Sequence, residues 1–136
     1  MSQQDFDEAL KQYNMAMSEF FKGNPKPINN FYSSCDEISL AQLSGGFVIG
    51  RDKVTDLASR NALKYREGAN TTFETLAKYA TPELAYIVQI ERTNAKIGQS
   101  NKVVSLALRV TSIFRLEEGV WRLLHRHVDS NVLPLG

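Results

Sequence analysis

One long alternating segment near the end of the chain constrains the fold more than any other feature. Apolar and polar residues alternate from Leu106 to Asp129, on both sides of Glu118-Gly119. This pattern predicts two half-buried antiparallel strands joined by a tight turn, which is a long β-hairpin. Both histidines and the single tryptophan of the chain fall within it. We therefore expect any chemistry of the protein to involve this hairpin or its neighbours.

The turn of the hairpin decides which residues share a face. A three-residue loop over 117–119 places Ser112 on the same face as Arg126, whereas a two-residue loop places Ser112 with His125. Glycine at the third loop position favours the three-residue form, because that position needs a left-handed backbone. In this form one face carries Val110, Ser112, Phe114, Arg122, Leu124 and Arg126.

The first half of the chain shows helical periodicity. Apolar residues recur at steps of four and three between Phe6 and Phe20, which predicts one buried helix face. Gly23-Asn24-Pro25 ends this helix, because proline cannot continue the hydrogen-bond ladder. Two further helices are expected at Lys26–Tyr32 and Arg51–Arg66.

The pattern in the rest of the chain predicts mainly strands. Alternating runs predict strands at 37–42, 71–79 and 84–91, followed by the two arms of the hairpin, and the glycines between 45 and 50 predict a loop. Helices gathered in one half and strands in the other favour an α+β fold, in which three helices cover the concave face of a curved antiparallel or mixed sheet. A length of 136 residues fits a single domain, 1–136.

Composition excludes several classes of partner. A net charge of +1 gives an electrostatic field too weak to predict binding to nucleic acid. No stretch is long and apolar enough to span a membrane. Gly45-Gly46 lacks the Lys-Ser/Thr ending of a phosphate loop, so no nucleotide or other cofactor is expected. The single cysteine, Cys35, and the absence of a signal peptide favour the reducing cytoplasm.

Two histidines on one strand raise the question of a metal. His125 and His127 are two residues apart, so they project from one face, and Asp129 lies on the same face. The chain has no other histidine, and metal sites usually draw ligands from several elements. We expect no metal; instead the imidazoles would bond Thr111, Arg109 or a neighbouring subunit.

Arg126 is the strongest candidate for a ligand-binding residue. A guanidinium on a pocket wall presents a planar fork to a carboxylate or an enolate. The alternative is an ion pair with Glu91 or Asp129. Hydroxyl groups that could complete such a pocket belong to Ser112, Tyr86 and Tyr32.

Several segments together resemble a known family. These are Phe20-Phe21 before Gly23, the run Ala107-Leu108-Arg109-Val110-Thr111, Phe114-Arg115 before the turn, and Trp121 to Asp129. With the order of elements, they resemble SnoaL-like proteins of the ketosteroid-isomerase and nuclear-transport-factor-like superfamily, whose fold is also called cystatin-like. The last segment is also similar to the association domain of calcium/calmodulin-dependent kinase, which has a Trp-x-x-x-His-x-His run.

The resemblance implies a cone-shaped barrel with a pocket between sheet and helices, assembled as a homodimer through the convex sheet face. It implies that Ser112, Leu124, Arg126 and Val128 point into the pocket, together with Phe114. It places Trp121, His125 and His127 on the convex face between subunits, beside Arg109 and Thr111.

The positions that match the catalytic aspartates of the isomerases do not carry carboxylates in this sequence. By rough alignment the base falls near Ala41-Gln42 and the second aspartate near Ser112, and neither is a carboxylate here. Glu91, on a central strand, is the candidate replacement base.

Two functional hypotheses follow. In the first, the protein binds a modest apolar ligand with one acidic or carbonyl group, and acts by isomerase-, cyclase- or hydratase-type acid–base chemistry through Arg126 and Glu91. In the second it is a non-catalytic dimerisation or ligand-sensing module. An apolar cavity with an unpartnered buried polar group favours the first, and a cavity filled by side chains favours the second.

Overall fold

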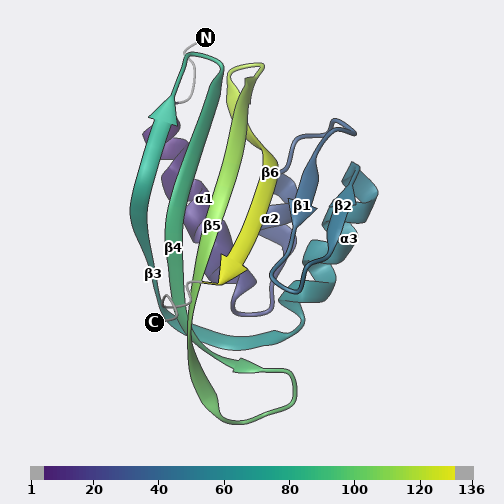
Figure 1. Ribbon diagram of the computed structural model, residues 1–136, viewed down its shortest axis with the longest axis vertical. Helices are drawn as coiled ribbons and strands as arrows, with labels where there is room; N and C mark the ends of the chain where they lie inside the picture. The colour runs from purple at the N-terminus through teal and green to yellow at the C-terminus, as the bar shows by residue number, and fades with distance from the viewer. Residues whose placement is uncertain (1–4, 131–136) are drawn as a thin grey trace, which may run out of the picture.

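Residues 5–130 are described by the computed structural model, and within them three helices lie on one side of a single six-stranded sheet (Figure 1). The helices are α1 (Phe6–Phe20), α2 (Lys26–Phe31) and α3 (Arg51–Ala62). The strands are β1 (Ser39–Ala41), β2 (Phe47–Ile49), β3 (Tyr65–Ala80), β4 (Leu84–Ile97), β5 (Val103–Glu117) and β6 (Val120–Ser130). None of the described helices is both long and apolar enough to cross a membrane.

The sheet is mixed. Its strands follow the order β2-β1-β6-β5-β4-β3, and all neighbours are antiparallel except β1 and β6, which are parallel. Register shifts interrupt β3 at three places and β6 at one. Such irregularities bend a strand and increase its twist, which accounts for the curvature of the sheet around the helices.

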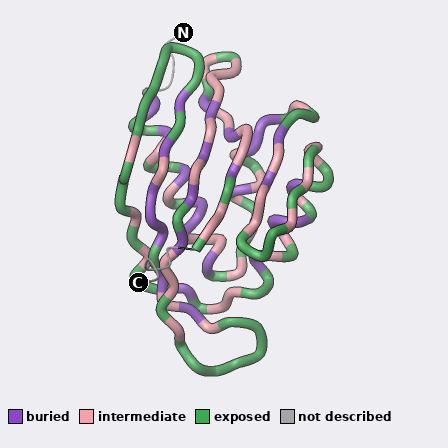
Figure 2. Tube along the Cα trace, in the orientation of Figure 1, coloured by how far each residue is buried: buried purple, intermediate pink, exposed green. Residues whose placement is uncertain are grey.

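The core lies between the helices and the concave face of the sheet. The apolar stripe of α1 is buried there because it recurs with the period of a helix, and it packs against the central strands. Figure 2 shows buried stretches along α1 and in the middle of β4, β5 and β6. Aromatic rings fill much of this space: Phe6 meets Phe114 and Trp121 edge to face, with ring centroids 5.3 and 5.1 Å apart.

The predicted α+β class, with three helices and a curved mixed sheet, is confirmed. Several boundaries differ from the prediction: β1 is shorter than 37–42, for example, and β4 continues past 91 to Ile97. The segment after Gly46, expected to be a loop, contains the short strand β2, because three residues are too few to show an alternating pattern. Tyr65, expected at the end of a helix, instead begins β3, where it pairs with Ile97 and packs against Phe21.

The central hairpin has a different turn from the one expected. Glu117 pairs with Val120, so the loop has two residues, and Glu118 and Gly119 both have positive φ, 51° and 81°. Two successive positive φ angles define the tight turn that suits the twist of a hairpin. The preference for a three-residue loop was therefore wrong.

A bulge farther along β6 changes the register again. Phe114 pairs with Leu123, but Ile113 pairs with His125, so Leu124 is an extra residue without a partner on β5. Beyond the bulge, Ser112 lies opposite Arg126. Residues on the two sides of Leu124 therefore follow opposite alternation, and this decides which side chains enter the core.

Candidate functional site

A cavity of about 260 Å³ lies between the helices and the inner face of the sheet. Apolar atoms form most of its wall, and six of its residues also bring polar side-chain groups to it. The lining residues come from the end of α1, β1 and the loop after it, the junction of α3 with β3, and the strands β5 and β6: Phe20, Phe21, Leu40, Gln42, Leu43, Ser44, Asn61, Lys64, Tyr65, Leu108, Arg126 and Val128.

Arg126 is the one buried charged residue of this lining. It is 6% exposed, and its guanidinium forms an ion pair with Glu91, which is 0% exposed. Arg126 Nη1 donates to Glu91 Oε2 at 3.1 Å, and Nη2 donates to Glu91 Oε1 at 3.4 Å. The two side chains come from β6 and β4, which flank β5 in the sheet, so the pair spans the inner face of the central strand.

Tyr13 connects this pair to α1. Its hydroxyl accepts a hydrogen bond from Arg126 Nη1 and forms a second one, 2.7 Å long, with the Ser112 hydroxyl. Burial raises the pKa of Tyr13 to about 12, although the positive charge of Arg126 acts in the opposite direction. The phenol is therefore neutral at ordinary pH, and its oxygen serves as an acceptor for the guanidinium.

Glu91 has a second polar neighbour behind the cavity wall. Gln89 Nε2 donates to Glu91 Oε2 at 3.2 Å and to Asn14 Oδ1 at 3.0 Å. The amide oxygen of Gln89 is buried and has no hydrogen-bond partner among the described residues. Glu91 itself does not line the cavity, so it reaches the cavity only through Arg126.

The electrostatics of the pair keep Arg126 charged. Burial is the largest single influence and lowers the pKa of Arg126, but the charge of Glu91, the nearby Tyr13 and Tyr32 and the hydrogen bond to Glu91 together outweigh it, so the net effect raises the pKa. Burial also raises the pKa of Tyr32 and Tyr65, which stay neutral in the same region. The cavity wall thus presents the Arg126 cation, and the Glu91 carboxylate that balances its charge lies behind the wall.

The guanidinium still has unused donors. Arginine has five N–H groups, and the bonds to Tyr13 and Glu91 use three of them. The other two have no partner among residues 5–130. An apolar cavity with such donors in its wall can bind a molecule that presents a hydrogen-bond acceptor.

The expected ligand-binding residues divide into three groups. Val128 lines the cavity beside Arg126. Ser112, Phe114 and Tyr32 are buried on the inner side but do not line the cavity. Tyr86 and Leu124 were predicted to contribute to the pocket, but neither lines the cavity.

Strand alternation accounts for both errors. Tyr86 is five residues from Glu91 on β4, and an odd separation on a regular strand puts two side chains on opposite faces. Glu91 points inward, so Tyr86 points outward and is 41% exposed. Leu124 is the bulge residue; it is partly buried against the edge of the core and lines a surface hollow with Leu84 and Gly119 instead of the cavity.

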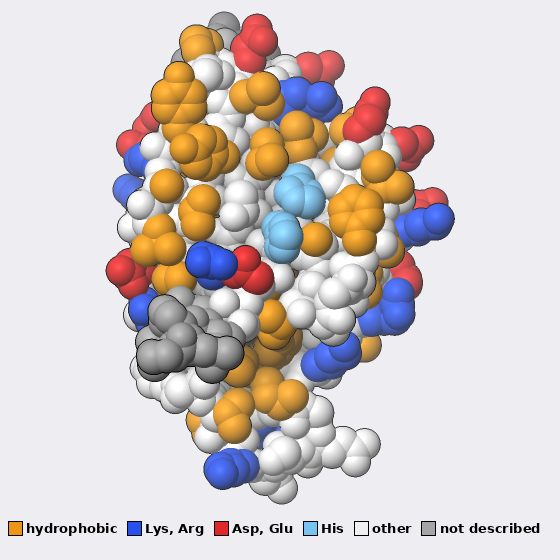
Figure 3. Space-filling model, viewed as in Figure 1, with side chains coloured by type: hydrophobic (Ala, Val, Ile, Leu, Met, Phe, Trp, Pro, Cys, Tyr) orange, Lys and Arg blue, Asp and Glu red, His pale blue; other side chains and the backbone are white. Residues whose placement is uncertain are grey.

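Four of the residues expected at a subunit interface lie on the face of the sheet that no helix covers, which we call the convex face. Figure 3 shows the two histidines side by side there. His125 Nδ1 hydrogen-bonds the Ser39 hydroxyl at 2.7 Å, and burial lowers the pKa of His125. Arg109 forms an ion pair with Asp129 at 2.9 Å on the same face, and Thr111 lies opposite His127.

Trp121 is the exception, and its predicted position was wrong. It is 5% exposed and packs against Phe6 of α1 in the core. The cause is the bulge: Trp121 precedes Leu124, so it points inward like Leu123, whereas His125 follows the bulge and points outward.

Most residues of the site were not identified from the sequence: among the lining residues only Arg126 and Val128 were, and Tyr13 and Lys64 illustrate why the others were missed. Tyr13 was taken only as part of an apolar helix stripe, although a buried phenol hydroxyl normally needs a polar partner and could have signalled one. Lys64 gave no signal, because it comes from the turn between α3 and β3 and reaches the cavity only in the folded chain.

The described residues contain no group of three or more histidine, cysteine or acidic side chains that could hold a metal ion. His125 and His127 have ring centroids 6.4 Å apart. No cofactor chemistry is assigned to the site.

Comparison with known proteins identifies the fold. A model of the SnoaL-like domain family matches residues 8–131. No curated protein matches the chain. Three solved structures superpose along most of both chains, at sequence identities that show the fold alone.

The first is a ketosteroid isomerase-like protein from Erwinia carotovora atroseptica, with a TM-score of 0.76, 12% identity, and coverage of 93% of this chain and 94% of that one. The second is a candidate dehydratase of the nuclear transport factor 2-like family from Streptomyces avermitilis, with a TM-score of 0.75, 13% identity, and coverage of 94% and 95%. The third is a candidate calcium/calmodulin-dependent protein kinase type II association domain from Thiobacillus denitrificans, with a TM-score of 0.74, 12% identity, and coverage of 97% and 99%.

The buried pair predicts a specific pattern of stability. Arg126→Met should lower the free energy of unfolding by about 3–5 kcal/mol, because it leaves the Glu91 carboxylate buried without a cation. The double variant Arg126→Met/Glu91→Leu should recover more than half of that loss. Urea denaturation measures all of these values.

The matched control removes an exposed pair of the same kind. Arg60→Met/Asp56→Leu on α3, away from the convex face, should change the free energy of unfolding by less than about 1 kcal/mol. If the free energy of unfolding of Arg126→Met lay within about 1 kcal/mol of the wild-type value, the ion pair could not be buried as the structure shows it.

Tyr13 predicts a loss of stability at high pH. Its pKa is raised to about 12 in the folded chain and is about 10 in the unfolded chain, so the unfolded state loses its proton first as pH rises above 10. Stability should then fall by up to roughly 2–3 kcal/mol between pH 10 and 12. Urea denaturation at pH 8 to 11.5 should show a shallower fall for Tyr13→Phe, whereas the exposed control Tyr79→Phe should match the wild type. Equal falls in all three proteins would refute this role of Tyr13.

Proposed function

The chain belongs to the SnoaL-like domain family, and from this premise we propose that its cavity binds a small, mostly apolar molecule with one carbonyl or acidic group. The observation that carries the proposal is the buried guanidinium of Arg126. It lines a mostly apolar cavity, and two of its N–H donors have no partner among the described residues. Small-molecule sites commonly combine an apolar wall with a few fixed polar groups.

The fixed position of Arg126 supports binding. Its side chain is held by Glu91 from the sheet and by Tyr13 from α1, so little conformational freedom is lost when a ligand accepts a hydrogen bond. The surrounding aromatic and aliphatic side chains would remove water from that bond, which strengthens it.

We propose that binding takes place without catalysis, as in a ligand-sensing module. Acid–base catalysis needs a group that carries a proton within reach of the ligand. The described residues that line the cavity include no carboxylate and no imidazole; their proton carriers are Lys64, which is exposed, and Tyr65, whose pKa is raised by burial. Glu91 is separated from the cavity by the guanidinium that it holds, so it acts as a positioning residue for Arg126.

Acid–base activity is the second candidate function. Its specific support is the position of Glu91, which lies 3.1 Å from Arg126. A small movement of the guanidinium would expose the Glu91 carboxylate to a carbonyl compound bound in the cavity. A ketosteroid isomerase-like protein and a candidate dehydratase are among the similar structures. In this version Arg126 would stabilise an enolate and Glu91 would carry the proton.

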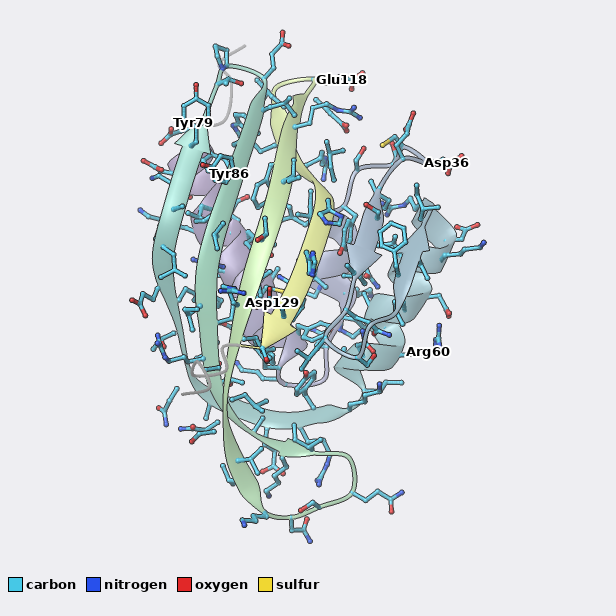
Figure 4. The ribbon with its side chains drawn as sticks, viewed as in Figure 1. Asp36, Arg60, Tyr79, Tyr86, Glu118 and Asp129 are labelled. Carbon is cyan, nitrogen blue, oxygen red and sulfur yellow. The ribbon has the colours of Figure 1, made fainter. Side chains whose placement is uncertain are left out.

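We also propose a homodimer formed through the convex face. Six exposed apolar side chains lie on that face: Phe47, Ile49, Tyr79, Leu84, Tyr86 and Val120. Figure 3 shows hydrophobic atoms spread over this face around the histidines, and Figure 4 shows Tyr79 and Tyr86 next to each other on β3 and β4. Extended exposed apolar patches mark interaction surfaces.

Binding is tested with two probes of the same shape. Acetophenone has a carbonyl group, and ethylbenzene lacks it. In NMR titrations the wild type should bind acetophenone at least about tenfold more tightly than ethylbenzene, because the carbonyl bonds to a charged donor. The difference should disappear in Arg126→Met/Glu91→Leu and persist in Arg60→Met/Asp56→Leu.

Equal binding of the two probes by the wild type, or no binding of either, would refute the proposal. The same samples in D₂O decide between its two versions. A sensing module leaves the methyl protons of acetophenone to exchange at the uncatalysed rate. Faster exchange that is lost in Glu91→Gln would instead establish the second candidate.

The dimer is tested by sedimentation. The wild type should sediment at twice the chain mass of 15.3 kDa, and Tyr79→Glu/Tyr86→Glu should sediment as a monomer. The matched control, Met15→Glu/Leu63→Glu, changes two exposed apolar residues of α1 and the end of α3, and should stay dimeric. A monomeric wild type, or a dimer unaffected by the tyrosine substitutions, would contradict the assignment.

A further inference from the structure

The charges around the cavity are distributed unevenly. At the buried end, the charge of Arg126 is balanced by Glu91. Lys64 also lines the cavity, is exposed, and has no ion pair among residues 5–130; we call its part of the cavity the exposed end. Because no acidic residue is among the described lining residues, Lys64 is the unbalanced charge of the cavity.

The buried end favours a neutral acceptor. A carboxylate placed against Arg126 would bring a second anion close to Glu91, around a single cation and away from water. Like charges so arranged repel, and each buried ion also loses its hydration. A carbonyl oxygen accepts the two unused N–H donors without either cost.

The exposed end favours an anion. Gln42 and Asn61 bond to each other there, since Asn61 Nδ2 donates to Gln42 Oε1 at 2.8 Å, so these amides are partly satisfied without a ligand. Lys64 is exposed, and an anion beside it would keep most of its hydration. Phe20, Tyr65 and Val128 line the cavity together with these two ends.

We propose that the ligand is an oxo-acid: its carbonyl group points inward to Arg126, and its carboxylate points outward to Lys64. Its body is apolar and lies against Phe20, Tyr65 and Val128. This inference rests on the proposed binding function, and it adds the chemical class of the ligand, its orientation, and Lys64 as the residue that selects it.

Three probes with one common ring test the orientation. 4-Acetylbenzoate has both groups, 4′-methylacetophenone has only the carbonyl, and 4-ethylbenzoate has only the carboxylate. The wild type should bind 4-acetylbenzoate most tightly. Lys64→Gln should weaken its binding about two- to fivefold, the range of one exposed charge pair, and should leave 4′-methylacetophenone unchanged. Raising NaCl to 0.5 M should have the same effect on the wild type.

Lys53→Gln is the matched control, because Lys53 is an exposed lysine of α3 that does not line the cavity. It should not change the affinity for any probe. Arg126→Met/Glu91→Leu should lose the advantage of 4-acetylbenzoate over 4-ethylbenzoate, which reports the inward carbonyl.

Two results would overturn the inference while leaving the proposed function intact. One is acetophenone binding that depends on Arg126, together with 4-acetylbenzoate binding that Lys64→Gln does not weaken. The other is tight binding of 4-ethylbenzoate that is lost in Arg126→Met/Glu91→Leu, which would place the carboxylate at the buried end. Failure of acetophenone and all three probes to bind would refute both proposals.

Discussion

The site depends on one buried ion pair. Moving Arg126 and Glu91 out of water costs several kcal/mol for each charge, and their mutual attraction offsets this cost only when the remaining hydrogen bonds are satisfied. Tyr13 accepts from the guanidinium, and Gln89 donates to the carboxylate. These partners come from α1 and β4, so the helix layer and the sheet must pack correctly before the pair is stable. The fold in this way fixes the direction of the guanidinium beside the cavity.

A single extra residue puts Arg126 in that position. The tight turn at 118–119 sets a register in which Trp121 and Leu123 point into the core. If the strand continued regularly, the next inward residues would be His125 and His127, and Arg126 would face outward. The bulge at Leu124 reverses the alternation. One insertion therefore assigns the guanidinium to the cavity and both histidines to the convex face, where the proposed dimer would bury them.

The sequence predicted features that depend on local pattern. Helical spacing located α1, and alternation located the long hairpin, so the class of fold and the layer arrangement followed. Errors arose where the pattern was short or interrupted. The strand β2 has only three residues, and a bulge leaves no clear mark in the sequence because Leu124 suits either face. Tyr86 and Glu91 could have been separated by their odd spacing alone. The cavity wall could not be predicted, because contacts such as that of Lys64 join segments far apart in the chain.

The central claim is that the Arg126 guanidinium is held inside the molecule between Glu91 and Tyr13. NMR of protein labelled with ¹⁵N-arginine measures this directly through the side-chain N–H protons. The account predicts that those of Arg126 exchange slowly with water and show nuclear Overhauser effects to the Tyr13 ring, whereas those of Arg60, whose side chain is exposed in Figure 4, exchange rapidly. Arg126 protons that exchange as fast as those of Arg60, with no effect to Tyr13, would contradict it.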